Sequence, residues 1–147
     1  MGSEFGHRIF NLEFRVYFVE IPMREIIETK DAPAPIGPYS QAVRANGFVF
    51  ISGQIPVGAE TGQVVESEIA VQTHQVMKNL SAILNAAGSR MENVVKTTVF
   101  LSNLDDFPEF NRIYGKYFEK ARPARSTVQV ARLPKEILLE IEAVAAV

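Results

Sequence analysis

Hydrophobic and polar residues alternate in two segments near the end of the chain, and this period of two predicts two β-strands. In residues 125–130 the alternation places Arg125 and Thr127 on the same face of the first strand. In residues 138–145 one face is apolar throughout, and Glu140 lies on the opposite face among hydrophobic neighbours. Because a charge removed from water is costly unless it is paired, Arg125 and Glu140 should each contact a partner. That partner is either the other residue or a ligand.

Four further strands are predicted upstream of these two. Residues 24–29 form a short strand, and residues 41–45 and 48–54 form a hairpin closed by Asn46-Gly47, a dipeptide that favours tight two-residue turns. Residues 94–102 are rich in β-branched side chains, which predicts a central strand. The hairpin ends in Ser52-Gly53, where the glycine admits either a β-bulge or a ligand lying close to the backbone.

Apolar residues recur every three to four positions in two other segments, which predicts two amphipathic helices. The first covers residues 68–87, with Ser67 as the expected cap at its start and Gly88 at its end. The second begins with a capping box at residues 106–109 and directs its aromatic side chains toward the core. Asn111 stands within that aromatic face, so its amide should be hydrogen-bonded.

The order of these elements is strand, hairpin, helix, strand, helix, strand, strand. This order predicts an α+β sandwich in which two helices cover one face of a mixed β-sheet. The strands hold more apolar residues than one covered face needs, because both faces of several strands are hydrophobic. We therefore expect a homo-oligomer whose subunits bury the second face of each sheet, with pockets between the subunits.

Length and composition indicate one domain behind a leader. The chain has 147 residues, of which 47% are hydrophobic and 22% charged, as in an ordinary globular domain with a sizeable core. Residues 1–22 begin with a Gly-Ser-Glu-Phe run that resembles a translated cloning site, and Met23 has the character of a natural start. The single domain is accordingly expected to span residues 23–147.

Hydrophobicity, charge, and the content of cysteine and histidine narrow the range of possible functions. No apolar run reaches the ~20 residues that a membrane-spanning helix needs. The net charge of -2, without a basic block, argues against nucleic acid as the main partner. The chain has no cysteine, which excludes thiol chemistry and fits a cytoplasmic location. With only His7 and His74, neither a zinc site nor a Ser/His triad is expected. His74 lies off the apolar stripe, on a surface or an interface.

Arg125 and Glu140 admit two interpretations on residue chemistry alone. In the first, they form a structural ion pair or lie on a solvated sheet edge. In the second, they line a small pocket, where the planar fork of Arg125 grips a carboxylate and Glu140 is an acid or base tuned by burial. The proline-rich loop at residues 31–40 is likewise either a plain connector or a rigid support for Tyr39.

Several motifs, taken together, resemble those of one family. They are GPYSQA at residues 37–42, ISGQIP at 51–56, VKTTVF at 95–100, PARS at 123–126 and ARLPK at 131–135. In these motifs, their order and their spacing, residues 23–147 resemble the RidA/YjgF family of reactive intermediate deaminases, in particular its RidA branch.

This resemblance implies a chorismate-mutase-like fold assembled as a homotrimer, with clefts between neighbouring subunits. It also implies hydrolysis of enamine and imine intermediates to 2-oxo acids and ammonia. The expected substrates are 2-aminoacrylate with 2-iminopropanoate, and 2-aminocrotonate with 2-iminobutanoate. The ligand is then a small imino or 2-oxo acid, and no cofactor is expected.

The family pattern transfers position by position. Arg125 matches the arginine that grips the substrate carboxylate, and Glu140 matches the glutamate that activates the attacking water and handles its proton. Tyr39 matches a tyrosine that lines the cleft. These residue types suit the chemistry, because a protonated imine is already electrophilic and needs only to be held while water is delivered to its carbon.

Four more positions match residues near the family's pocket. Ser52, Gly53 and Asn111 are assigned roles in shaping it and in hydrogen bonding. Thr127 stands where many relatives carry a cysteine. Since water is the nucleophile in the implied reaction, the loss of that thiol need not abolish activity.

Two other functions are compatible with such a fold, which alone does not decide function. One is a non-catalytic trimer that binds a small ligand, and the other is a ribonuclease or translation inhibitor. The absence of a pocket histidine and of a basic aromatic strip weakens the ribonuclease hypothesis. The presence of both Arg125 and Glu140 favours a deaminase over a binding module.

Overall fold

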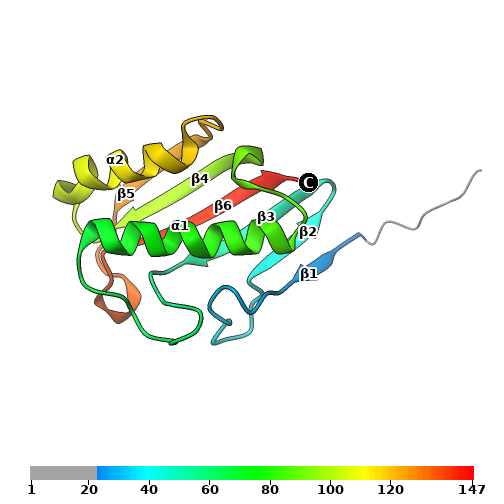
Figure 1. Ribbon diagram of the computed structural model, residues 1–147, viewed down its shortest axis with the longest axis horizontal. Coiled ribbons are helices and arrows are strands. Elements are labelled where there is room, and N and C mark those ends of the chain that lie inside the picture. Colours follow the sequence, from blue (N-terminus) through cyan, green and yellow to red (C-terminus); the bar gives the residue numbers. More distant parts are fainter. Residues whose placement is uncertain (1–22) are drawn as a thin grey trace, which may run out of the picture.

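The computed structural model describes residues 23–147, so the predicted leader lies outside the described residues. Two helices, α1 (Ile69–Ala86) and α2 (Phe107–Phe118), lie against one face of a six-stranded sheet (Figure 1). The strands are β1 (Glu25–Ile27), β2 (Ala42–Ala45), β3 (Phe48–Gln54), β4 (Val94–Leu101), β5 (Ala124–Gln129) and β6 (Leu139–Ala146). The short 3₁₀ turns are η1 (Met91–Asn93), η2 (Leu104–Asp106) and η3 (Pro134–Glu136). The predicted α+β fold and element order are confirmed.

The sheet has the strand order β1-β2-β3-β6-β4-β5. Neighbouring strands are antiparallel except for β4 and β5, which are parallel and are connected through α2. The predicted hairpin is present, and Asn46 and Gly47 both have the positive φ angles, 50° and 78°, that a tight two-residue turn requires. The last strand therefore lies between β3 and β4, which brings the Ser52-Gly53 segment and Glu140 into adjacent strands.

The helix side of β6 forms the centre of the core. Leu139, Ile141 and Ala145 have no exposed surface, as their alternation predicts. They pack with the apolar stripes of both helices in one hydrophobic cluster. Within residues 23–147, no helix is long and apolar enough to cross a membrane.

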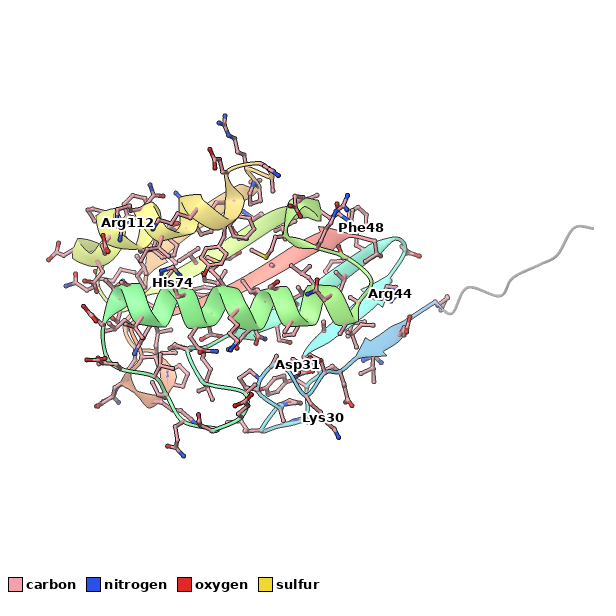
Figure 2. The ribbon with its side chains drawn as sticks, in the orientation of Figure 1. Lys30, Asp31, Arg44, Phe48, His74 and Arg112 are labelled. Atoms are coloured by element: carbon pink, nitrogen blue, oxygen red, sulfur yellow. The ribbon has the colours of Figure 1, made fainter. Side chains whose placement is uncertain are left out.

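The uncovered face of the sheet carries large apolar side chains. They are Phe48, Phe50, Val95 and Val128, each between 42% and 50% exposed. Phe48 is labelled beside the β2–β3 hairpin in Figure 2. The predicted second apolar face is thus present, and the homo-oligomer that would bury it stays a prediction.

Both predicted N-terminal caps are wrong. The cap position of α1 is Glu68, which is extended and makes no side-chain cap bond, so Ser67 lies one residue too early. Asp106 has helical φ and ψ because η2 runs directly into α2, and its side chain caps nothing. The capping side chain is instead Asn103, which accepts a hydrogen bond from the Asp105 amide at 2.9 Å.

The position predicted for Asn111 is also wrong. The face of α2 toward the core includes Ile113, which is fully buried together with Phe110. That rotates the buried stripe away from Asn111, whose side chain is exposed. Its amide needs no partner inside the protein, because water or a ligand can reach it.

The predicted C-terminal cap of α1 is confirmed. Gly88 has φ 72°, its amide donates to the Asn85 carbonyl at 3.0 Å, and the Ser89 amide donates to the Leu84 carbonyl at 2.9 Å. These two bonds form a Schellman motif, which needs a left-handed residue at the position of Gly88.

Gly88→Ala is expected to lower the free energy of unfolding by about 1–2 kcal/mol, because alanine is strained in the left-handed conformation. Urea unfolding followed by circular dichroism measures the change. Gly115→Ala is the matched control, since Gly115 lies inside α2 with open space around it. That change should raise the free energy of unfolding by about 0.5–1 kcal/mol. Equal effects of the two changes would contradict the Schellman assignment.

Candidate functional site

Glu140 lies on the uncovered face of the sheet, between β4 and β3. It pairs with Phe100 of β4, while a β-bulge in β3 between Ile51 and Gln54 brings Gly53 beside it. A Cβ atom on Gly53 would collide with the Glu140 carboxylate, whose Cδ would be 2.8 Å away. The interpretation of this glycine as part of a bulge is confirmed, and the close approach of a ligand to its backbone stays a prediction. A glycine is required at position 53, because any side chain there would occupy the space of the Glu140 carboxylate.

The surroundings of Glu140 change its acidity. Its side chain is half-buried, and this burial raises the pKa of the carboxyl group above the ordinary value of 4.5. The negative charge of Glu142, two residues along on the same face, raises that pKa further. Glu140 consequently holds a proton more readily than an exposed glutamate does.

Tyr39 lies in the proline-rich loop, which is fixed to the fold by the buried side chain of Gln41. The Oε1 atom of Gln41 accepts a hydrogen bond from the Thr29 amide at 2.7 Å. Its Nε2 atom donates to the carbonyl oxygens of Thr29, Ala32 and Pro33 at 3.0, 3.2 and 2.9 Å. These bonds fix the loop at Thr29, Ala32 and Pro33, whereas Tyr39 is exposed and its role in a cleft stays a prediction.

Ser52 joins the same loop to β3. Its hydroxyl donates to the Ser40 carbonyl at 2.6 Å, and its amide donates to the Gln41 carbonyl at 3.0 Å. The hydroxyl proton of Ser52 is thus used within the protein, and a role of this residue in shaping a pocket stays a prediction. Tyr39, Ser52, Gly53 and Glu140 together are called the glutamate half-site.

A cavity of about 280 Å³ adjoins the glutamate half-site. Its lining includes Ile36, Tyr39, Gly53, Ile55, Val57 and Lys135, and it is called the loop cavity below. Buried amides fix its walls: Asn79 donates to the carbonyls of Ile55 and Val57 at 3.0 Å each, and the Gln72 Oε1 atom accepts from the Leu138 amide at 2.8 Å.

Sequence reasoning missed these amides. Gln72 and Asn79 lie seven residues apart, on the buried side of α1, and both are fully enclosed. Polar residues in an apolar stripe are the signal that identifies them, since each needs a fixed hydrogen-bond partner.

Arg125 lies at the opposite edge of the protein, on β5, beneath α2. Its guanidinium carbon is 4.6 Å from the centroid of the Tyr114 ring and 5.5 Å from that of Phe107. The Tyr114 hydroxyl shares a hydrogen bond of 2.7 Å with Thr97, which fixes the ring. The aromatic rings hold the cation in place through contacts with their faces and leave its N–H groups free.

No hydrogen bond or salt bridge within residues 23–147 uses the guanidinium of Arg125. The salt bridges in this part of the chain are Arg44 with Glu25 at 3.3 Å and Arg112 with Glu109 at 2.7 Å. A groove of about 420 Å³ opens beside Arg125. A carboxylate in this groove could bind the guanidinium with both oxygens.

Asn111 and Thr127 flank this arginine. Asn111 lines the same groove from α2. Thr127 shares the face of β5 with Arg125, and its buried Oγ1 atom has no hydrogen-bond partner within residues 23–147. Arg125, Asn111 and Thr127 are called the arginine half-site. It offers several unsatisfied polar groups to a ligand.

The two half-sites lie on opposite faces of the sheet. Arg125 pairs with Thr97, which is buried beneath the helices, whereas Glu140 pairs with Phe100 on the uncovered face. An ion pair between Arg125 and Glu140, one of the two interpretations left open above, is therefore excluded within one chain.

His74 takes no part in either half-site. It lies on the side of α1 that faces α2 (Figure 2), where its Nδ1 atom is 2.7 Å from the Tyr117 hydroxyl. The prediction of a surface histidine is confirmed. In the described residues, no three His, Asp or Glu side chains are placed to hold a metal ion.

Comparison with known proteins shows which family this chain resembles in sequence. The sequence profile described as Endoribonuclease L-PSP matches residues 29–147. A RutC family protein of Pyrococcus horikoshii is 51% identical over 123 residues, 84% of this chain and 98% of that protein. The 2-iminobutanoate/2-iminopropanoate deaminase of Mus musculus is 47% identical over 123 residues, 84% of this chain and 91% of the relative.

A solved structure agrees with these sequence matches. The protein of unknown function YyfA from Yersinia pestis, which is described as belonging to the conserved Rid family, superposes with a TM-score of 0.83. It is 50% identical in sequence, and the match covers 84% of this chain and 99% of that one. The motifs, the fold and the sequence matches agree over almost the whole of the described region. This chain belongs to the Rid/YjgF family, the family of the Endoribonuclease L-PSP profile.

Proposed function

We propose that this protein hydrolyses short 2-imino acids, namely 2-iminopropanoate and 2-iminobutanoate with their enamine tautomers, to 2-oxo acids and ammonia. The observation that carries the proposal is the pair of half-sites. One presents a guanidinium that has no hydrogen-bond or salt-bridge partner in residues 23–147, and the other presents a carboxyl group with a raised pKa against a glycine. The name of the mouse relative, a deaminase of these two imino acids, supports the same reaction.

Two copies of the chain are needed to complete such a site. We infer a homotrimer in which the uncovered sheet faces are buried against neighbouring copies. The exposed apolar side chains of that face support this assembly. The arginine half-site of one copy then meets the glutamate half-site of the next, in a cleft between them.

The residues divide the chemistry between them. The imino acid binds as an iminium carboxylate, and Arg125 holds the carboxylate with two parallel hydrogen bonds. Ionised Glu140 takes a proton from water as the water oxygen bonds to the imine carbon. The tetrahedral intermediate carries a hydroxyl and an amino group. Glu140 returns its proton to the amino group and then accepts the hydroxyl proton as the C–N bond breaks and the carbonyl forms. Ammonia leaves with the 2-oxo acid and takes that proton as ammonium, which leaves Glu140 ionised. The atoms balance without an oxidant, reductant or cofactor.

The raised pKa of Glu140 suits this exchange. A higher pKa makes the ionised carboxylate a stronger base toward water, and it lets the protonated form persist long enough to return the proton to the leaving amine. In the proposed assembly, Tyr39 and Asn111 line the cleft from its two sides. Thr127 supplies a hydroxyl in place of the thiol that many relatives carry.

The ribonuclease alternative has less support in the structure. An RNA-cleaving site of the usual kind needs a pair of acid–base groups near a phosphate, and His74 is hydrogen-bonded to Tyr117 away from both half-sites. A non-catalytic ligand-binding trimer would contain the same cleft, and turnover distinguishes it from the enzyme.

The direct test generates 2-iminobutanoate in place from threonine with a pyridoxal-phosphate dehydratase. Added protein should speed the release of ammonia and 2-oxobutanoate beyond the spontaneous rate. A protein that binds 2-oxobutanoate but leaves the rate of release unchanged would be a binding module.

Mixed assemblies test whether the site is shared. Arg125→Ala and Glu140→Gln variants, co-expressed with different tags, should recover activity that neither has alone. If copies mix at random, about one site in four joins an intact Arg125 to an intact Glu140, so roughly a quarter of the parental rate is expected. Mixed assemblies, isolated through both tags, that remain inactive would place both residues' roles within one copy.

A further inference from the structure

The loop cavity extends beyond the place where the reacting carbon would lie. It adjoins Glu140 at Gly53 and continues past Ile55 and Val57, with a volume of about 280 Å³. A methyl or ethyl side chain would fill a small part of it, because one water-sized group takes only about 30 Å³. The short substrates named above therefore leave this space unused.

Among the described residues that line the loop cavity, Lys135 is the only charged one. The rest of the lining consists of apolar side chains, glycines, two glutamines and Tyr39. Neither salt bridge in residues 23–147 involves Lys135. Glu140 takes part in neither of these salt bridges, and the Lys135 side chain is exposed. The ammonium is thus available to a ligand.

The backbone at Lys135 is held in an unfavourable conformation. Lys135 has φ 55° and ψ 20°, and Glu136 also has φ 55°. Two successive left-handed residues without a glycine are rare, since each side chain crowds the backbone. Pro134 before them and the fully buried Ile137 after them fix the turn. Conformations of this kind persist where the fold imposes them, and they cluster at ligand sites.

We propose that the loop cavity receives the substrate's side chain and that Lys135 binds an acidic group at its end. The enzyme would then accept 2-imino dicarboxylic acids in addition to short neutral imino acids. This inference rests on the proposed function. One carboxylate binds Arg125 of the neighbouring copy, the imine carbon lies at Glu140, and the second carboxylate reaches Lys135. The reaction is unchanged: water adds, ammonia leaves and a 2-oxo dicarboxylic acid forms.

The test compares two imino acids with the same carbon chain. An amino-acid oxidase makes 2-iminopentanedioate from glutamate and 2-iminopentanoate from norvaline, and loss of imine is followed with a semicarbazide trap. The parent protein should prefer the dicarboxylate by about tenfold in kcat/KM, the ratio that one charge-assisted contact supports. Lys135→Gln should remove the preference, and Lys135→Arg should retain it. Lys78→Gln, the matched loss of a lysine on the outer side of α1, should leave the ratio unchanged.

The outcomes separate this inference from the proposed function. Suppose that 2-iminobutanoate is hydrolysed but the two five-carbon imino acids react at equal rates, or that the preference survives in Lys135→Gln. Either result overturns the role of Lys135 and leaves the proposed function intact. If no imino acid is hydrolysed, the proposed function fails. In that case, calorimetry with 2-oxopentanedioate and 2-oxopentanoate tests whether Lys135 binds a second carboxylate. Tighter binding of the dicarboxylate that is lost in Lys135→Gln supports the site, and equal binding of the two acids overturns it.

Discussion

Arg125→Ala is expected to lower kcat/KM for 2-iminobutanoate by about 100- to 1,000-fold, the loss typical when one member of a buried, hydrogen-bonded charge pair is removed. The guanidinium has no hydrogen-bond partner within the described chain, so its N–H groups are free for the substrate carboxylate. Without them the imino acid loses both its main attraction and its orientation toward Glu140. Steady-state kinetics with the dehydratase-coupled assay measure the loss.

Two further variants make this result specific. Arg125→Lys keeps the positive charge but not the planar fork, so its activity should lie between those of the parent and of Arg125→Ala. Arg112→Ala is the matched control, because Arg112 is salt-bridged to Glu109 on the exposed side of α2. Its activity should equal that of the parent. A folded, assembled Arg125→Ala protein with parental kinetics would refute the assignment.

Most of the fold could be predicted from the sequence, because its signals are periodic and local. The alternation in β6 identifies one fully apolar face, and burial of Leu139 and Ile141 confirms it. The Asn46-Gly47 turn and the Gly88 cap are confirmed for the same reason, since each depends on a residue that tolerates positive φ.

The predictions that failed depend on geometry that residue types do not fix. Ser67 and Asp106 are good capping residues, yet a cap bond requires the residue itself to be extended at the first turn. Asp106 is helical, and the extended residue before α1 is Glu68. The aromatic residues of α2 alone do not locate its buried face, because Ile113 is also fully buried and turns that face away from Asn111.

The site could be predicted only in parts. Alternation shows that Arg125 and Thr127 share a face and that Glu140 lies opposite the apolar face of its own strand. Alternation does not show whether the face of β5 that carries Arg125 and the face of β6 that carries Glu140 lie on the same side of the sheet. The register through β4 decides this, with Thr97 opposite Arg125 and Phe100 opposite Glu140. The separation of the half-sites is therefore a property of pairing between strands, as is the contact of Glu140 with Gly53.

Glu140→Gln is expected to lower kcat by about 100- to 10,000-fold, the usual range for the loss of a general acid–base group. The amide fills the same space against Gly53 but can neither take a proton from water nor return one to the leaving amine. In the parent, the rate should fall as the pH drops through the raised pKa of Glu140, because only the ionised form accepts a proton. A variant with unchanged turnover would show that another group activates the water.

The same substitution should also make the protein more stable near neutral pH. Because the pKa of Glu140 is raised above 4.5 in the folded state, the native protein holds this proton more tightly than the unfolded chain does. Stability therefore declines as the pH rises from 4.5 through the raised pKa, and above it the full cost of a half-buried, ionised carboxylate is present. Glutamine avoids that cost.

The gain in the free energy of unfolding of Glu140→Gln over the parent, measured by urea unfolding between pH 4 and pH 8, should grow across this window and then level off. Glu142→Gln is the comparison, because it removes only the lesser cause of the raised pKa, the neighbouring charge, and leaves the burial of Glu140 in place, so its gain should be smaller. A larger gain from Glu142→Gln than from Glu140→Gln would show that the main destabilising charge is not that of Glu140. A larger gain from Glu140→Gln would show that the Glu140 carboxylate lowers the stability of the fold, as functional groups often do.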